Sequence, residues 1–313
     1  MWNVPHAGRL PADRDYIKQL EYAGGYVKKS DSNKERVLSP MTTILITGAN
    51  GQLGSLILEN LRSRIPVGQI IAGVRSVEQA SLIREQGIEV RKVDYDLPET
   101  LNEAFRGISR LLLISSSHTD DDVRLSQHKR VIDAAKRSGV RHILYTGFAF
   151  SGRRTDQSKP DNVHTLTEQA IIESGLEYTF LRNALYIDFV GVLGLKEALS
   201  SGELVTAPGE WKFNSASRRD LALAAAAAVF GEGGAGNRIY ELTAPQTWDF
   251  GDLAEVLTEV AGKPVVHRQD DGVQHWIYAF MSKLDTASTS GDLERLMGRP
   301  VTPLRDSILP FIV

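Results

Sequence analysis

Gly48-Ala49-Asn50-Gly51-Gln52-Leu53-Gly54 follows the apolar run Ile44-Leu45-Ile46 and precedes an amphipathic stretch at residues 54–64. A strand, a glycine-rich turn and the start of a helix, in that order, place bare backbone N–H groups where a pyrophosphate can dock. One glycine makes the tight turn, one lets the phosphate approach the backbone, and one lets the helix pack against the strand. The spacing is G-x-x-G-x-x-G rather than the standard G-x-G-x-x-G, and a purely structural turn is the alternative. The setting favours nucleotide binding, with cofactor contacts expected at Gly48, Asn50, Gly51, Gln52, Leu53 and Gly54.

The composition of the 313-residue chain is typical of a globular protein, with 42% apolar and 24% charged residues. A net charge of −3 offers no basic field for a phosphate backbone, which argues against nucleic acid as the main partner. The absence of cysteine excludes disulfides, thiolate nucleophiles and Cys-ligated metals. No cluster of His, Asp and Glu has the spacing of metal ligands, so we expect no metal.

Two segments bear on location. The longest apolar run, residues 221–230, is about half the length needed to cross a bilayer, and no secretory signal precedes it. This run is rich in alanine and follows Asp220, a good N-cap, so it predicts a buried helix. We therefore expect a soluble, cytoplasmic protein with no membrane partner. Residues 1–40 show no periodicity, and we expect a disordered extension or sequence upstream of a start at Met41, with a docking or targeting arm as the alternative.

From Thr43 onward, short β-rich runs alternate with helical patterns, which predicts parallel βαβ units. The expected strands are residues 43–47, 70–74, 89–94, 111–115, 141–146 and 178–182, and the expected helices are residues 52–64, 77–86, 98–105, 126–138 and 162–174. Gly87, Gly107, Gly139 and Gly175 stand where helices should end. The fold class is α/β, a Rossmann-type doubly wound parallel sheet with a small C-terminal substrate lobe. We expect the NADP-binding domain at residues 41–182 and the lobe mainly at 183–313, with residues 216–244 returning to the first domain.

The end of the second strand bears on which dinucleotide binds. An NAD-preferring site usually places Asp or Glu there, about twenty residues past the turn, to accept from the ribose hydroxyls. Here the strand ends in Arg75, whose guanidinium fork matches a 2′-phosphate. We therefore predict NADP as the cofactor, preferred over NAD; a solvated strand-end residue is the alternative. Asp94 and Ser115, which close the third and fourth strands, are further expected cofactor contacts.

The residues after the fifth strand bear on the chemistry. Short-chain dehydrogenases use a Tyr and a Lys four residues later, but Tyr145 is followed at that place by Ala149. Thr146, Gly147 and Asn183 close strands on the ligand side and are candidate cofactor or carbonyl contacts.

Several stretches together resemble the NmrA-like branch of the atypical short-chain dehydrogenases/reductases. They are the turn at residues 48–54, residues 111–115, Tyr145-Thr146-Gly147-Phe148-Ala149-Phe150, His164-Thr165-Leu166-Thr167-Glu168 and Tyr178-Thr179-Phe180-Leu181-Arg182-Asn183-Ala184-Leu185-Tyr186. The likeness runs from about Met41 to the carboxyl end, and within that branch it is greatest to triphenylmethane reductases and NADPH:quinone oxidoreductases. It implies a Rossmann domain, NADPH, and hydride transfer to a flat, conjugated acceptor. The chain departs from this pattern in residues 1–40, which are extra, and in residues 268–275, where a longer helical segment is usual.

The resemblance and the residues together give a candidate active site. Aromatic rings stack on flat ligands, so we expect the substrate pocket to contain Phe148, Phe150, Tyr186 and Trp211. Asn183, which closes a strand on the ligand side, is expected there as well. His164 and Tyr145 are the candidate catalytic residues. His164 stands where related isoflavone-reductase-like enzymes carry a lysine, so it could contact the nicotinamide ribose or donate a proton near neutral pH. A helix-entry histidine bonded to backbone is the alternative.

Three functions compete at this point. The first is an NADPH-dependent reductase of quinones or triarylmethane-type dyes, with a small aromatic substrate as its partner. The second is a redox-sensing regulator that binds NAD(P) without turnover, and the third is an imine or ketone reductase of secondary metabolism. The glycine turn and Arg75 fit both the first and the second, whereas the aromatic residues and His164 favour an enzyme. The oligomeric state and the physiological acceptor stay open.

Overall fold

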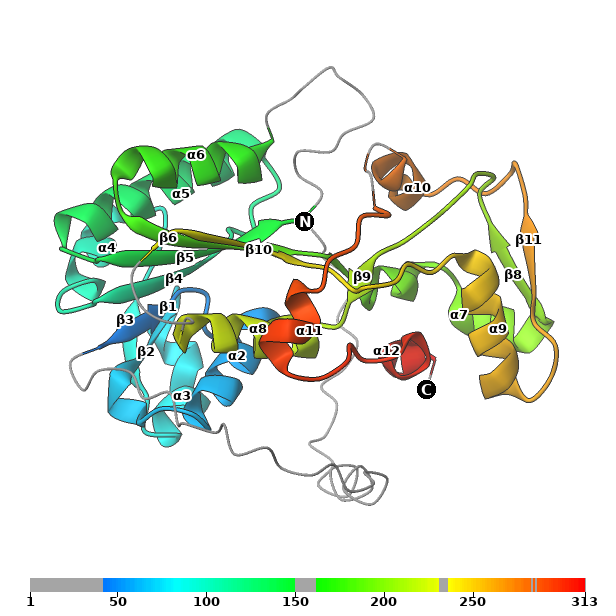
Figure 1. Ribbon diagram of the computed structural model, residues 1–313, viewed down its shortest axis with the longest axis horizontal. Helices are drawn as coiled ribbons and strands as arrows, with labels where there is room; N and C mark the ends of the chain where they lie inside the picture. Colours follow the sequence, from blue (N-terminus) through cyan, green and yellow to red (C-terminus); the bar gives the residue numbers. More distant parts are fainter. Residues whose placement is uncertain (1–41, 150–161, 231–235, 283, 285, 313) are drawn as a thin grey trace.

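The computed structural model describes residues 42–149, 162–230, 236–282, 284 and 286–312. The expectations for residues 1–40 and for Phe150 lie outside this part of the chain. Its centre is a sheet of seven parallel strands in the order β10-β6-β5-β4-β1-β2-β3 (Figure 1). The strands are β1 (Ile44–Ile46), β2 (Ile70–Val74), β3 (Glu89–Lys92), β4 (Arg110–Ile114), β5 (His142–Phe148), β6 (Glu177–Asn183) and β10 (Arg238–Leu242). The strand order reverses between β1 and β4, which confirms the doubly wound α/β prediction.

Helices cover both faces of the sheet. They are α2 (Gln52–Arg62), α3 (Ser81–Glu85), α4 (Pro98–Ala104), α5 (Asp121–Arg137), α6 (Val163–Ser174) and α8 (Arg218–Phe230). Figure 1 shows α4, α5 and α6 on one face and α2, α3 and α8 on the other. On β1, Ile44 and Ile46 pack into the core beneath α2 and α8, while Leu45 packs into the core beneath α4 and α5. Alternate residues therefore face opposite cores, and both faces of β1 are fully buried.

A smaller lobe follows β6 and has a core of its own. Its elements are β7 (Leu185–Tyr186), η3 (Ile187–Val192), α7 (Leu195–Ser201), β8 (Glu203–Thr206), β9 (Ser215–Ala216), α9 (Phe250–Ala261), β11 (Val266–Gln269), α10 (Trp276–Met281), α12 (Leu304–Ile308) and η4 (Leu309–Phe311). In both small sheets, β7 with β9 and β8 with β11, the strands pair in parallel. Residues 216–244 supply α8 and β10 to the main domain. One later helix, α11 (Asp292–Met297), also packs there, against α8.

Helix ends show where the sequence reading holds and where it fails. The four expected stop glycines all have φ between +73° and +79°, as predicted. The helix expected at residues 126–138 begins earlier, at Asp121, because the Asp120 carboxylate accepts the N–H groups of Asp122 and Val123. The N-cap expected at Asp220 was wrong. Asp220 lies inside α8, its N–H donates to the Ser217 hydroxyl at 3.0 Å, and its buried carboxylate accepts from Arg299.

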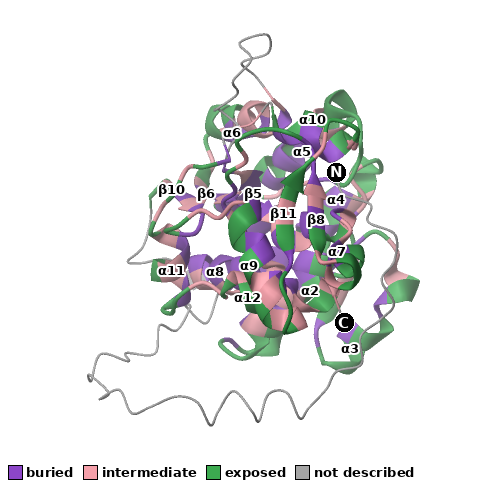
Figure 2. Ribbon diagram, turned by 90° about the vertical axis from the view of Figure 1, so that its right-hand side faces the viewer, coloured by how far each residue is buried: buried purple, intermediate pink, exposed green. Residues whose placement is uncertain are grey.

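The distribution of burial follows these layers. Figure 2 shows buried residues along the strands and between the helical layers, while outer helices such as α3 and α7 turn exposed residues to the outside. Across the described residues, no helix is both long enough and apolar enough to cross a membrane.

Candidate active site

The glycine turn between β1 and α2 has the geometry of a phosphate cradle. Gly48 adopts φ +58°, and the N–H of Gly51 donates to its carbonyl at 2.9 Å. A Cβ atom on Gly54 would lie 2.2 Å from the Gly48 carbonyl oxygen, so only glycine permits this approach of helix to turn. Gly51 caps α2 without a side-chain hydrogen bond, and no acidic residue occupies the first turn. The positive end of the helix dipole and its unpaired N–H groups thus fit a pyrophosphate.

Two side chains lie beyond the carboxyl ends of the neighbouring strands. Arg75 follows β2 directly and is exposed, and among the described residues no carboxylate pairs with its guanidinium. Asp94 follows β3 and accepts the N–H of Asp96 at 3.1 Å. Both residues thus lie at the edge of the sheet where the glycine turn lies.

A cavity of about 450 Å³ opens at the carboxyl ends of β4, β5 and β6. Seven of the residues expected at the site line it, namely Ser115, Thr146, Gly147, Phe148, His164, Asn183 and Tyr186. Ile114 also lines it and adjoins the glycine turn, because a Cβ atom on Gly48 would lie 3.8 Å from that of Ile114. Ile114 therefore borders both the cavity and the phosphate cradle, at the point where the strand order reverses.

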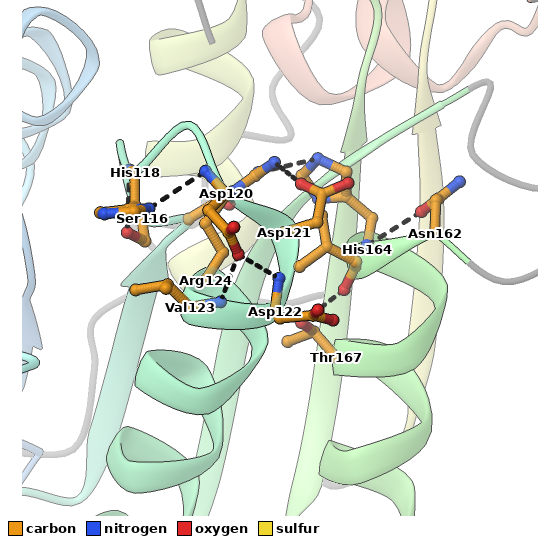
Figure 3. Close-up of polar contacts among 12 residues, drawn as sticks. Ser116, His118, Asp120, Asp121, Asp122, Val123, Arg124, Asn162, His164 and Thr167 are labelled. Carbon is orange, nitrogen blue, oxygen red and sulfur yellow. Dashed lines mark hydrogen bonds and ion pairs between the residues drawn. The ribbon is translucent and has the colours of Figure 1, made fainter.

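His164 is held at the wall of this cavity by its helix. The side chain of Asn162 caps α6 and accepts the N–H groups of His164 at 2.9 Å and Thr165 at 3.2 Å (Figure 3). The His164 ring then lies between two partners, with Nε2 at 3.3 Å from Arg124 Nη2 and Nδ1 at 2.9 Å from Tyr145 Oη. Because a guanidinium only donates, Nε2 accepts, and Nδ1–H donates to the tyrosine.

This geometry bears on the protonation of His164. Burial, followed by the charge of Arg124, lowers the pKa of His164 well below its ordinary value. A proton on Nε2 would point at the guanidinium, so the neutral ring is the stable form at pH 7. The expectation that His164 donates a proton near neutral pH is therefore opposed by its surroundings. Tyr145 is fully buried behind the wall, where burial raises the pKa of its phenol, and it does not line the cavity.

Arg124 is a charged cavity residue that the sequence analysis missed. It lies in the first turns of α5, where Nη1 pairs with Asp121 at 2.8 Å and Nη2 donates to the Ser115 hydroxyl at 3.0 Å. The available signal was the Asp120 cap, which starts the helix directly after the Ser115-Ser116-Ser117 run. The helix expected at residues 126–138 does not include Arg124, so its side chain was not considered for the site.

A buried histidine lies behind this wall. Nε2 of His128 accepts the backbone N–H of Ser116 at 2.8 Å, so Nδ1–H donates to the Thr167 hydroxyl, also at 2.8 Å. Burial, followed by the charge of Arg124, lowers the pKa of His128 to about 3. This ring ties α5 to the exit of β4 and to α6 without carrying charge.

The structure separates Trp211 from the expected pocket, which corrects that prediction. Its Nε1 donates to the carbonyl of Ala207 at 3.0 Å, its ring packs beside Phe213 in the lobe core, and it lines a separate hollow of about 350 Å³. Phe280 of α10 lines the cavity instead. Its helix follows the short segment 268–275, so this part of the lobe still reaches over the site. Within the described residues, no three His, Asp or Glu side chains are grouped as a metal site requires.

The known proteins to which this chain is similar include several oxidoreductases. Residues 48–232 match a family model described as NAD(P)H-binding. The chain is 35% identical to quinone oxidoreductase 2 of Escherichia coli K12 over 283 residues. This match covers 85% of the chain and 97% of the relative. It is 31% identical over 293 residues to an NmrA-like family domain-containing oxidoreductase of Aspergillus flavus, covering 86% and 94%. The structure of a Citrobacter sp. triphenylmethane reductase complexed with NADP(H) matches with a TM-score of 0.77 at 42% identity, covering 85% of this chain and 98% of that chain.

A parallel sheet that reverses its order beside a glycine turn, with a cavity at its carboxyl edge, is the architecture of a dinucleotide-binding protein. The chain belongs to the NAD(P)H-binding, NmrA-like family of oxidoreductases. This confirms the resemblance drawn from the motifs.

Proposed function

We propose that this enzyme uses NADPH to reduce a flat, conjugated acceptor such as a quinone or a triarylmethane-type dye. The observation that carries the proposal is the cavity at the ends of β4, β5 and β6, which is lined by Phe148, Tyr186 and Phe280 and whose lining residue Ile114 adjoins the phosphate cradle. The bound dinucleotide would supply the hydride. The chain's own task is then to hold the acceptor against the reduced ring and to exclude water.

The preference for NADPH over NADH rests on Arg75. Its guanidinium lies at the carboxyl edge of the sheet, one strand away from the cradle, with no carboxylate partner among the described residues. A planar cation suits a 2′-phosphate and cannot accept from ribose hydroxyls. The relatives support this assignment, since the Citrobacter triphenylmethane reductase was solved with NADP(H).

His164 and Tyr145 act in this proposal as positioning residues. The neutral His164 ring contacts both Arg124 and Tyr145, so it holds the Arg124 side chain in place at the cavity wall and supplies no proton. Quinone and dye acceptors need no strong acid at the reacting carbon. We therefore expect kcat to stay flat between about pH 6 and 8 apart from effects on the acceptor itself. A bell-shaped profile that disappears in His164→Ala would contradict this role.

The decisive experiment follows NADPH absorbance with the purified protein against menadione, malachite green and a cyclic imine. We expect oxidation of NADPH with the quinone or the dye, and faster turnover with NADPH than with NADH. Tight calorimetric binding of NADPH without turnover on any acceptor would instead favour a nucleotide-sensing regulator. Turnover of the imine alone would favour a reductase of secondary metabolism.

A further inference from the structure

The cavity wall carries two charged side chains among its described residues, Arg124 and Asp121, and they differ sharply in exposure. The side chain of Arg124 is 11% exposed, whereas that of Asp121 is 62% exposed. Water screens the carboxylate far more than the guanidinium, so the field inside the cavity is positive. The neighbouring His164 is neutral and adds no compensating charge.

We propose that Arg124 determines acceptor specificity: it selects neutral or anionic carbonyl compounds and disfavours cationic dyes. This inference rests on the proposed function and names the substrate class within it. The relatives alone do not decide between the two classes, because one is named for quinones and another for triphenylmethane dyes.

The guanidinium is held in place before any acceptor arrives. Nη2 donates to Ser115 at 3.0 Å and faces His164 Nε2 at 3.3 Å, while one N–H of Nη1 donates to Asp121 at 2.8 Å. Nε is buried without a partner among the described residues, and the guanidinium borders the cavity in which an acceptor carbonyl would bind. A donor fixed in this way needs little reorganisation when charge develops nearby.

For a quinone, reduction builds negative charge that Arg124 can stabilise. The acceptor gains a hydride, which is two electrons and one proton, and NADPH is the reductant that is oxidised. An oxygen of the quinone takes up negative charge, and a second proton from water completes the hydroquinone. Since this charge is larger in the transition state than in the bound quinone, the cation raises kcat.

For a cationic dye the same charge acts in the opposite sense. The hydride cancels the positive charge of the dye and leaves a neutral leuco product. Arg124 repels the dye most strongly before the transfer, so it weakens binding and raises KM. Because the repulsion is only partly relieved in the transition state, Arg124 lowers kcat/KM for the dye. The two acceptor classes therefore respond to the loss of Arg124 with opposite signs.

The test compares three acceptors in the wild-type protein, in Arg124→Gln and in Arg124→Lys. The acceptors are 1,2-naphthoquinone, its anionic 4-sulfonate and the cationic dye malachite green. We expect Arg124→Gln to lower kcat/KM for both quinones about tenfold and to raise it for the dye about tenfold. Arg124→Lys keeps the charge and should keep the order of preference. Arg64→Gln removes the same charge from an exposed site after α2 and should leave all ratios unchanged.

Two outcomes would overturn the inference. One is an unchanged quinone-to-dye ratio in Arg124→Gln that still unfolds at the wild-type temperature. The other is an equal loss on all three acceptors together with a higher KM for NADPH, which would assign Arg124 to the cofactor.

A binding measurement separates this inference from the proposed function. If the wild-type protein oxidises NADPH with none of the acceptors, the proposed function fails. Calorimetric titration with the sulfonate and the dye then decides the role of Arg124. A preference for the sulfonate that disappears in Arg124→Gln supports the inference, and the same preference in both proteins contradicts it.

Discussion

The phosphate cradle and the cavity wall lie at the carboxyl ends of the neighbouring strands β1 and β4, yet they are built from different parts of the chain. The cradle is backbone, shaped by three glycines within seven residues. The wall consists of side chains that follow β4 or belong to α5 and α6, and these side chains hold one another in place by direct contacts. Consecutive contacts join Ser115 to Arg124, Arg124 to His164, and His164 to Tyr145 behind the wall. A cradle of this kind depends on local conformation, whereas the wall depends on tertiary packing.

A single added carbon atom at Gly54 should disrupt the phosphate cradle more than any other change proposed here. In Gly54→Ala the added methyl would lie 2.2 Å from the Gly48 carbonyl oxygen and 2.9 Å from Ala49 Cα, so the turn must open. Overpacking against backbone costs about 3 kcal/mol, and we expect calorimetry to show a loss of NADPH affinity of about a hundredfold. Gly68→Ala is the matched control, because nothing lies within 4 Å of its added methyl. Wild-type affinity in Gly54→Ala would refute a backbone-built cradle.

The same contrast explains how much the sequence could predict. The strand, the turn and the glycine stops are local, and each was predicted because glycine at those positions has a conformational reason. The contact between Tyr145 and His164 was not predicted, because nothing near Tyr145 in the sequence shows that its hydroxyl contacts a ring nineteen residues later. Arg124 was missed through one misplaced helix start, and Trp211 was misplaced because its segment turns into the lobe core.

The wall should weaken most where its helix is pinned to the sheet. The guanidinium of Arg182 on β6 donates through Nε and Nη2 to the buried carboxylate of Glu168, one turn beyond His164 on α6. Glu168→Gln removes the charged partner of Nε and Nη2, while Nη1 keeps its bond to Glu241 at 2.7 Å, and we expect urea unfolding to show a loss of about 2 kcal/mol. Glu173→Gln changes an exposed residue of the same helix and should cost under about 0.5 kcal/mol. Equal effects of the two substitutions would mean that the pair does not anchor α6.

Substitution of Arg75 tests whether a single side chain gives the backbone-built site its preference for NADPH over NADH. Removing one charge-assisted contact costs about 1.5–3 kcal/mol. We therefore expect Arg75→Ala to lower the ratio of kcat/KM for NADPH to that for NADH about ten- to a hundredfold, measured with one fixed quinone. Activity with NADH should hardly change, because the cradle is intact. Arg64→Ala removes the same charge from an exposed residue after α2, so a similar loss there would point to overall charge instead.

The cavity wall should contribute a pH-dependent stability, because its histidines are neutral and buried. The folded protein keeps the pKa of His128 at about 3, while the unfolded chain takes up a proton near pH 6.5. The unfolded state thus binds more protons between these values. The contribution to the free energy of unfolding is complete above pH 6.5 and is lost at about 1.4 kcal/mol per pH unit as the pH falls toward 3. In His128→Gln the amide can still accept from Ser116 and donate to Thr167. Urea unfolding at a series of pH values should therefore show a flatter slope for this variant. The control His118→Gln changes an exposed residue and should give the slope of the wild type. Parallel slopes for all three proteins would show that the ring is charged in the fold, and the proton arrangement inferred for the wall would then be wrong.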